Sequence, residues 1–572
     1  MKSMGEPADD DDPGYAYLCV EPPPASDELE GTEDGVMEGA RKVREAAPAE
    51  AADLMTALQD AYDRWRAHIV EQVRQGALDS DEVKSFARKV QQAALVQVNM
   101  PQGSANLKGS DYHDAAMKTA ALVSVADKDA TTEAVCERNP LLCVPRVAKG
   151  PSLDDAKKRG IQTKTVTIGD PKTGTATGEA RTDVVVVFCP GVVRTNVEFG
   201  AQGKVALELG FASSRAETGT FIDAEVNSKA VADAVKRGKD LVGNPDAKII
   251  LVGYSQGNTN LYAFLRDKDG AWEDLRSSVI AVHDMHSAAN GSRFADLAFA
   301  VGRYLGSDDA PSAEDLALLQ ALYKSEAQNW HLPEKTLETS SQDLRKALHD
   351  LRVVIRDVDK VAAPVMKKLG LHSLTEAELG QTLLKFAVSQ DDLTQHFIDK
   401  GGLAAKAAAK FIKPLWDKIT SSKAREALQK GLLHDMLLIY LDGGLRSLST
   451  PYGGELMTDS ALADHAAGVF ILNSVGAVPV GREMELVPPS QRLNYIFFND
   501  GGWDNDYQVA LADQKLEGRL KNACDCYTQA IGHWGVAGVL VPVDHPATYF
   551  KDFSPPGLTR SALVTLGELG IV

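Results

Sequence analysis

The stretch that most restricts the fold of this chain lies between residues 247 and 265. Lys248 to Val252 is an apolar run typical of a central parallel strand, and Asn258 to Leu265 has helical periodicity. The turn between them, Gly253 to Gly257, reads G-x-S-x-G. Its two glycines remove side chains that would collide in a tight turn, which lifts Ser255 to the carboxyl edge of a sheet. We therefore expect a nucleophile at Ser255; the alternative is a plain turn between strand and helix.

Composition excludes several classes of protein. With 572 residues, 44% of them hydrophobic, the chain can build a large core and more than one domain. A net charge of −19 argues against a nucleic-acid partner, because phosphate recognition needs a basic surface. The amino terminus lacks the apolar core of a signal peptide, and no apolar run reaches the roughly 18 residues of a membrane helix. We expect a cytoplasmic protein, with signal-independent secretion left open.

The six cysteines are too few for a disulfide scaffold in a chain of this length. Cys136 and Cys143 are close enough in sequence to pair in an oxidising compartment, but free thiols are expected. Cys524 and Cys526 have the spacing of half a metal site, and no second half accompanies them.

Patterning divides the chain into five parts. Residues 1–36 are acidic and proline-rich, as in a disordered leader, and residues 37–160 have helical periodicity. The helical region either packs on the main domain or binds a protein partner that the sequence does not identify. An enzyme core is expected over 161–292 and 456–572, interrupted by a helical insertion over 293–455.

Strand-like runs occur on both sides of the insertion. Beyond the strand before Ser255, they lie at 163–168, 182–188, 277–282, 468–473, 493–498 and 538–543. The first two are separated by a turn and should pair antiparallel. The pattern predicts an α/β fold with about eight mostly parallel strands and the strand before Ser255 in the centre.

A loop near Ser255 is expected to bind the oxyanion of an acyl-transfer reaction. The buried strand that ends at Phe188 runs directly into Cys189-Pro190-Gly191. Backbone amides of Val192 and Gln256 are the candidate donors. The alternative is an ordinary Pro-Gly turn.

A serine nucleophile needs a histidine base, and the histidine needs a carboxylate that fixes its tautomer. Each is expected after a strand end, in the chain order serine, acid, histidine. Asp506 and His545 follow Ser255 in that order, and His545 comes directly after an apolar strand. His533 is the second candidate for the base.

The acid is drawn from a cluster of aspartates. Asp506 is preferred, and Asp504 and Asp500 are the alternatives. The cluster could instead hold calcium, although its oxygen ligands lack the spacing of a known loop. We expect no metal site.

Together these motifs resemble the α/β-hydrolase superfamily, especially its bacterial triacylglycerol lipases. The resemblance covers about 162–292 and 456–560 and includes the segment from His286 to Leu297. Asp506-Tyr507-Gln-Val resembles the Asp-Gly-x-Val pattern of the family's acid loop, with tyrosine in place of glycine. Pro190-Gly191 likewise stands where these lipases usually have His-Gly.

The resemblance implies a serine hydrolase that cleaves carboxylic esters of lipids or other apolar acids through an acyl-enzyme, without a cofactor. Tyr254 and His286 are expected to line the substrate pocket, and the insertion to form a helical cap. Within it, residues 403–416 are amphipathic with lysines on the polar side, which suits either peripheral membrane contact or packing on the cap. The alternatives are a thioesterase, a peptidase, or a non-catalytic scaffold that binds a protein.

Overall fold

The structure, a computed structural model, describes residues 29–46, 50–100, 112, 114–119, 136–144, 148–170, 174–191, 199–218, 223–296, 443–477, 504–529, 533 and 554–572. Most of the predicted leader and cap, and the predicted strands at 493–498 and 538–543, lie outside these residues. Over the described part of the chain, no helix combines the length and the apolar character needed to cross a membrane.

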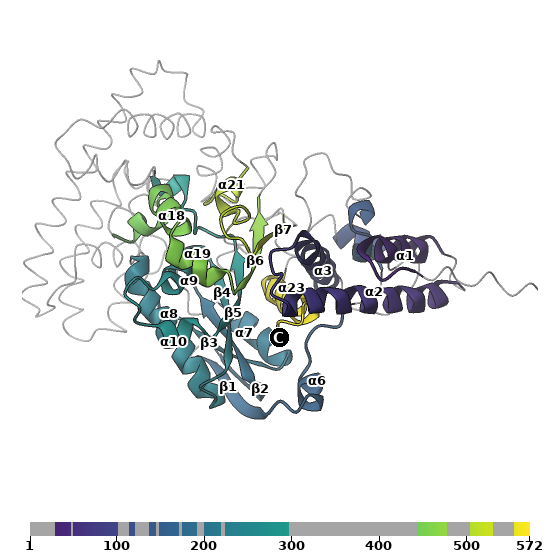
Figure 1. Cartoon of the computed structure of the whole chain (residues 1–572), viewed down its shortest axis with the longest axis horizontal. Coiled ribbons are helices and arrows are strands. Elements are labelled where there is room, and N and C mark those ends of the chain that lie inside the picture. The colour runs from purple at the N-terminus through teal and green to yellow at the C-terminus, as the bar shows by residue number, and fades with distance from the viewer. Residues whose placement is uncertain are drawn as a thin grey trace, which may run out of the picture.

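The described strands form one mostly parallel sheet of seven (Figure 1). They are β1 (Thr163–Asp170), β2 (Gly174–Cys189), β3 (Phe211–Arg215), β4 (Lys248–Tyr254), β5 (Val279–Met285), β6 (Phe470–Gly476) and β7 (Ala523–Gln529). The order is β1-β2-β4-β5-β6-β7, and β3 also pairs with β2. β1 and β2 are antiparallel, and the other pairs are parallel.

Strand β2 has two roles because it is 16 residues long. Its first half forms the antiparallel pair with β1, in which Thr163 lies opposite Arg181. Its second half lies between β3 and β4, where Val185 faces both Ala212 and Ile249. The predicted antiparallel pairing is therefore present, but the apolar run at 184–188 belongs to the parallel centre of the sheet.

Helices cover both faces of the sheet. One face carries α8 (Ala224–Val242), α9 (Gln256–Arg266), α10 (Glu273–Arg276), α18 (Thr450–Met457) and α19 (Ser460–Ala466). The other carries α3 (Asp81–Asn99), α7 (Gly200–Glu208) and α23 (Pro555–Glu568). The remaining described helices are α1 (Glu33–Glu45), α2 (Ala51–Arg74), α6 (Leu153–Lys158), α21 (Leu511–Gln514) and the 3-10 helices η2 (Pro140–Cys143) and η3 (Gly443–Leu448).

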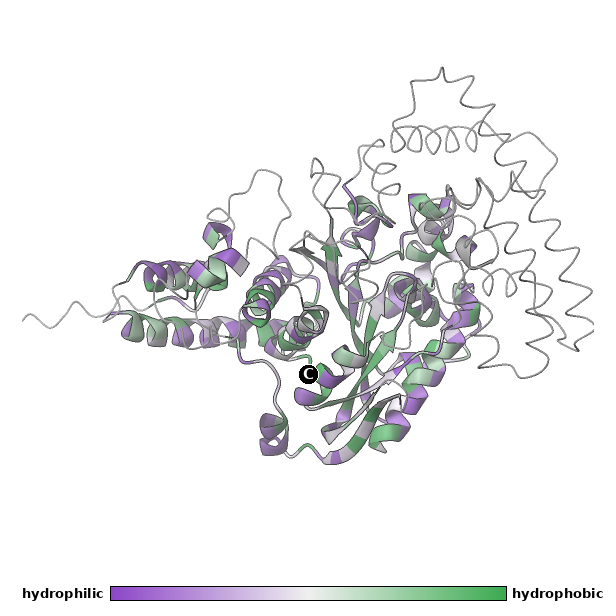
Figure 2. Ribbon diagram, turned by 180° about the vertical axis from the view of Figure 1, so that it is seen from behind, coloured by the Kyte–Doolittle hydropathy of each residue, from purple (hydrophilic) through white to green (hydrophobic). Residues whose placement is uncertain are grey.

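The two-residue repeat of a strand explains why the sheet has two cores. In β2, Val184, Val186 and Phe188 pack on the α23 side, whereas Val185 and Val187 pack on the α8 side. A strand buried on both faces reads as a continuous apolar run. Figure 2 shows the result: the central strands are mainly hydrophobic, and the helices carry hydrophilic residues on their outer sides.

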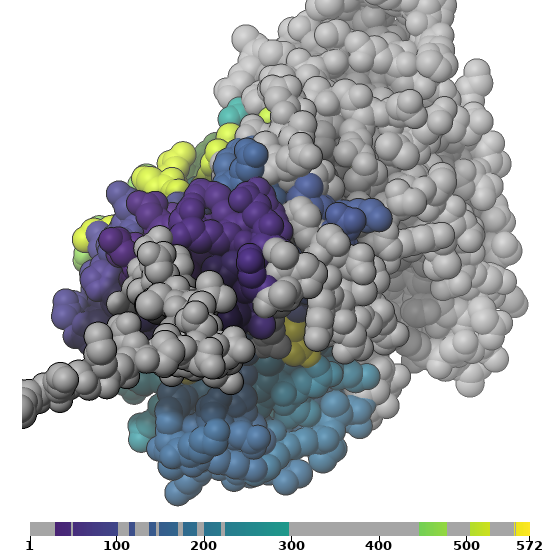
Figure 3. Space-filling view, turned by 90° about the vertical axis from the view of Figure 1, so that its right-hand side faces the viewer, coloured from purple at the N-terminus to yellow at the C-terminus, as the bar shows by residue number. Residues whose placement is uncertain are grey.

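The N-terminal helices join the core on the α23 side. Helix α3 packs against α23 and β7, and the side chain of Ser80 caps it by accepting the Val83 N–H (3.2 Å). Glu568 of α23 accepts the Tyr62 hydroxyl (3.1 Å) and lies 2.8 Å from Nε of Arg66. In the space-filling view from this side, these helices (purple) lie against the rest of the described chain (Figure 3).

Two strands are missing from the sequence-based prediction. β3 is half polar, and β7 contains the Cys524-Asp-Cys526 segment that resembles half a metal site. In β7 the two thiols are free and buried on the same face, with their sulfurs 3.8 Å apart, because alternate residues of a strand point to one side. The expectation of free thiols is wrong for Cys136, which is disulfide-bonded.

Candidate active site

Five chain segments that carry the candidate residues meet at one edge of the sheet. Cys189 ends β2, Ser255 follows β4 and His286 follows β5. Asp506 lies in the connection from β6 to β7, and His533 lies four residues beyond β7. The carboxyl ends of parallel strands share an edge, and connections that start there bring distant residues together.

Ser255 occupies a strained turn between β4 and α9. Its backbone angles are φ 55° and ψ −125°, and its side chain makes no capping hydrogen bond to the helix that it begins. A non-glycine residue at positive φ costs energy that the surrounding structure must offset. The turn is fixed on both sides: the Ser255 N–H donates to the Met285 carbonyl (3.3 Å), and the Ser255 carbonyl accepts the Asn258 N–H (3.0 Å).

The two glycines of the motif are required by close packing. A Cβ on Gly253 would lie 1.8 Å from Oδ1 of Asn258, and one on Gly257 would lie 2.0 Å from the carbonyl oxygen of Cys189. Ser255 keeps 8% of its surface exposed, whereas Gln256 beside it keeps none. The residues therefore form a tight turn from strand to helix, here called the elbow, in which the serine is more accessible than Gln256.

The Cys189-Pro190-Gly191 loop lies directly against the elbow. A Cβ on Gly191 would lie 3.1 Å from Cβ of Ser255 and 3.0 Å from the Tyr254 ring. Gln256 is the first residue of α9, so its amide belongs to the positive end of a helix dipole that favours an anion. Val192, the other predicted oxyanion donor, is outside the described residues.

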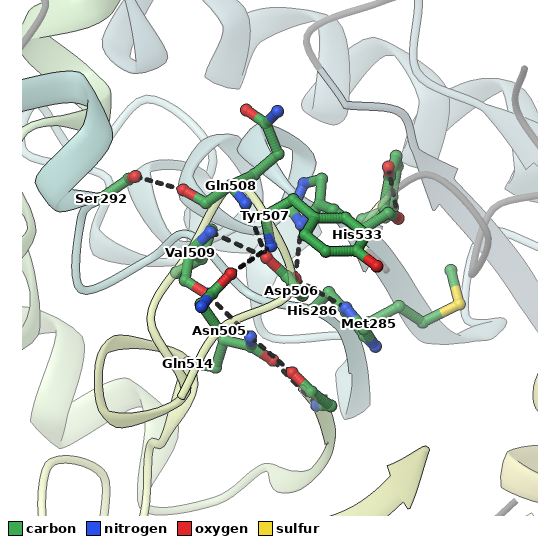
Figure 4. Close-up of polar contacts among 12 residues, drawn as sticks. Met285, His286, Ser292, Asn505, Asp506, Tyr507, Gln508, Val509, Gln514 and His533 are labelled. Atoms are coloured by element: carbon green, nitrogen blue, oxygen red, sulfur yellow. Dashed lines mark hydrogen bonds and ion pairs between the residues drawn. The ribbon is translucent and has the colours of Figure 1, made fainter. Parts of the chain in front are cut away.

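The Asp506 carboxylate is fully buried and accepts four hydrogen bonds (Figure 4). Its Oδ1 accepts the backbone N–H groups of Gln508 (3.0 Å) and Val509 (2.8 Å). Its Oδ2 accepts Nδ1–H of His286 and Nδ1–H of His533, both at 2.7 Å. An ionised carboxylate has about four acceptor positions, so this one is saturated.

These contacts set the charge state of Asp506. Burial by itself would raise the pKa of the carboxyl group, but the two imidazoles outweigh it and hold the pKa well below the usual range. Burial also lowers the pKa of His286, more than Asp506 raises it. The group is therefore an aspartate anion that bridges two histidines, and His286 is neutral near pH 7.

His533 is held between the acid and the elbow. Its backbone N–H donates to the Asp506 carbonyl (2.8 Å), and its own carbonyl accepts the Tyr254 hydroxyl (2.8 Å). The rings of Tyr254 and His533 lie 5.1 Å apart. Because Tyr254 immediately precedes Ser255, these contacts attach His533 to the residue before the serine.

The predicted pocket residues lie deeper than expected. Tyr254 is 5% exposed, with its hydroxyl on the His533 carbonyl, and His286 is fully buried against Asp506. Burial follows from their positions within and just after central strands. Both side chains therefore lie beside Asp506 and His533.

The acid loop explains how tyrosine replaces glycine after the aspartate. Tyr507 has φ 81°, the left-handed conformation that glycine adopts most easily. Its N–H donates to Oδ1 of Asn505 (2.9 Å), and the Asp506 N–H donates to the Val509 carbonyl (3.2 Å). These bonds close a tight turn that aims the Asp506 side chain at the histidines.

His286, Asp506 and His533 also form a group whose ligand atoms lie within 4.8 Å of one another. The distances favour hydrogen bonds over a metal. Two ligands about 2.0–2.1 Å from a tetrahedral zinc lie about 3.3 Å apart, and the Nδ1 atoms lie only 2.7 Å from Oδ2.

His545 and Asp500 are outside the described residues, so the predicted contact between Asp506 and His545 is not described. The contact that the structure does describe involves His533, the second candidate. A sequence signal for it exists. Cys524 and Cys526 alternate with polar residues, which is a weak strand pattern, and a histidine shortly after a strand end is where the base is expected.

No protein-family model and no curated protein sequence matches this chain. Among solved structures, it is similar to the lipase BlEst2 of Bacillus licheniformis, with 12% identity, 65% of this chain and 91% of that one covered, and a TM-score of 0.32. It is also similar to the metagenomic carboxyl esterase MGS0156, with 13% identity, coverages of 71% and 80%, and a TM-score of 0.34. For lipase B of Aspergillus fumigatus the identity is 14%, the coverages are 45% and 58%, and the TM-score is 0.17. Identities and TM-scores this low do not assign a function to the chain.

Proposed function

We propose that the chain is a serine ester hydrolase of the α/β-hydrolase type, with Ser255 as nucleophile, His533 as base and Asp506 as acid. The observation that carries the proposal is the connected set of contacts from the buried Asp506 carboxylate through His533 to Tyr254, the residue before Ser255. His533 takes the place predicted for His545.

The proposed reaction is acyl transfer to water. His533 donates Nδ1–H to Asp506, which leaves Nε2 to accept the proton of the Ser255 hydroxyl as Oγ attacks the ester carbonyl. The imidazolium then gives that proton to the leaving alcohol. A second cycle, in which His533 removes a proton from water, hydrolyses the acyl-enzyme and restores Ser255.

The negative oxygen of the tetrahedral intermediate is assigned to the side of the elbow that faces the Cys189-Pro190-Gly191 loop. The Gln256 amide is one donor, supported by its place at the start of α9. The Val192 amide is the second, supported by the approach of Gly191 to Ser255. Both would bind charge that appears only in the transition state.

Apolar esters are the proposed substrates, with the insertion as a cap over the site; the place where the insertion begins and ends supports the cap. The Ser292 N–H donates to the Leu448 carbonyl (2.8 Å), and Asp296 accepts the N–H (2.9 Å) and hydroxyl (2.6 Å) of Thr450. The Ser292 hydroxyl donates to the Gln508 carbonyl in the acid loop. The insertion therefore leaves and re-enters the core beside Asp506, which is a position suited to a cap over the site. We also propose that this cap makes peripheral contact with membranes.

The test is labelling with a fluorophosphonate together with hydrolysis of p-nitrophenyl esters. Wild type should be labelled at Ser255, and Ser255→Ala should abolish both signals. His533→Ala should lower kcat by at least about 10⁴-fold, while His545→Ala should stay near wild type. Failure to label folded wild type would overturn the hydrolase proposal, and the reverse ranking of the two histidine variants would restore His545 as the base.

The type of acyl bond that is cleaved and the preferred acyl-chain length need a separate measurement. Thioester and amide substrates compared with esters of increasing chain length would separate an esterase from a thioesterase or a peptidase. A biological phenotype that survives Ser255→Ala would favour the scaffold alternative.

A further inference from the structure

We propose that His286 is a positioning residue. It donates a second hydrogen bond to Asp506, which fixes the carboxylate in place and weakens the electrostatic interaction between Asp506 and His533. The inference rests on the proposed function, because it concerns the same acid. It adds to the three proposed catalytic side chains a fourth that acts through Asp506.

The Asp506 carboxylate determines which nitrogen of each histidine carries the proton. An ionised carboxylate can only accept, so both Nδ1 atoms at 2.7 Å from Oδ2 must carry hydrogen. The two rings lie 6.1 Å apart in an edge-to-face arrangement, which lets both approach one oxygen without stacking. Each neutral ring is therefore held in the tautomer that has a bare Nε2.

The two histidines differ in what surrounds Nε2. In His286 this atom is buried and has no hydrogen-bond partner among the described residues. A proton placed there would be a buried charge without an acceptor, which is strongly unfavourable. The catalytic proton therefore goes to His533, and His286 stays a neutral donor throughout the cycle.

The backbone holds His286 in this role. Its φ is 46°, and its N–H donates to the Ser474 carbonyl of β6 (2.9 Å) just beyond the last pair of β5. The strained angle turns the side chain out of the strand alternation and toward the acid loop. Such strain persists only where neighbouring contacts enforce it.

Removing this donor should change the pH dependence of catalysis in one direction. Without His286, Asp506 interacts more strongly with His533, which stabilises the imidazolium. The acid limb of the kcat/KM profile should then move to higher pH, by about 0.5 to 1 unit. Because Asp506 is also less well fixed, kcat should fall about 10-fold, with KM little changed.

The variants are matched by shape. His286→Leu keeps the bulk, excludes water and removes the donor, whereas His286→Asn keeps a donor near the Nδ1 position and tolerates positive φ. His283→Leu is the control: His283 is buried in β5, the strand that His286 follows, but it bonds Ser474 Oγ (3.0 Å) instead of Asp506. His286→Leu should shift the acid limb, His286→Asn should largely restore it, and His283→Leu should leave it in place.

Proton NMR reads the same hydrogen bonds without turnover. Wild type should show two far-downfield ring N–H signals, of which His286→Leu removes one and His533→Ala the other. Unchanged kcat and pH profile in His286→Leu, or a loss of kcat equal to that of His283→Leu with no pH shift, would overturn the inference. If wild type lacks Ser255 labelling altogether, the proposed function fails, and a missing second downfield signal would separately disprove the shared hydrogen bond.

Discussion

Replacing Gly257 with alanine tests whether the Cys189-Pro190-Gly191 loop and the elbow act as one unit. The added Cβ would lie 2.0 Å from the Cys189 carbonyl oxygen, and Cβ atoms essentially never approach closer than 3.0 Å. The difference, 3.0 − 2.0 = 1.0 Å, is the least distance by which the loop must move away from α9. The opposing atoms are backbone, so no side-chain rotation can relieve the contact.

The expected cost appears in both stability and rate. Overpacking of this kind destabilises a protein by about 1–3 kcal/mol. A displacement of about 1 Å in a catalytic group can cost roughly 100-fold in rate. We therefore expect Gly257→Ala to fold with reduced stability and to lose about 100-fold in kcat with a smaller change in KM, because the loop acts on the transition state.

Gly454→Ala is the matched control. Gly454 is also helical, and a Cβ there would meet nothing within 4 Å. That variant should gain up to about 1 kcal/mol of stability with unchanged turnover. Urea unfolding and p-nitrophenyl ester hydrolysis measure both effects. Wild-type kcat in folded Gly257→Ala would refute the assignment of the oxyanion site to this loop.

Three further predictions concern charge, metal and thiols. Burial lowers the pKa of His283 from 6.5 to about 3, so the unfolded chain binds its proton first. Stability should therefore fall as the pH drops below about 6.5, by up to about 1.4 kcal/mol per unit from this group, and urea unfolding at pH 7 and 5 should show a weaker dependence in His283→Leu. Dialysis against EDTA should leave esterase activity unchanged, and a loss restored by zinc would contradict the hydrogen-bonded assignment of His286, Asp506 and His533. Thiol titration of the unfolded chain should find four free thiols of the six cysteines before reduction, since Cys136 is disulfide-bonded, and six afterwards.

Local sequence patterns were sufficient to predict elements whose constraints come from residues nearby in the chain. The G-x-S-x-G turn predicts a strand, a strained serine and a helix, because the collision that excludes a side chain at Gly253 involves Asn258, five residues away. Helical periodicity and Ser80 likewise predict α3. Asp506 was preferred from its loop pattern, and the positive φ at Tyr507 explains why glycine is usual at that position.

Local patterns do not predict the hydrogen-bond partners of Asp506, because those partners depend on how the strands align in the sheet. β7 has a weak pattern of its own and is a strand because β6 pairs with it, which puts His533 at the same edge of the sheet as Ser255. His286 was expected in the pocket, and its contact with an acid 220 residues later depends on the order of β5, β6 and β7. The tight turn around Ser255 was predictable from local sequence, because Asn258 alone excludes a side chain at Gly253. The imidazoles that share Asp506 were not, because their contacts join distant strand ends.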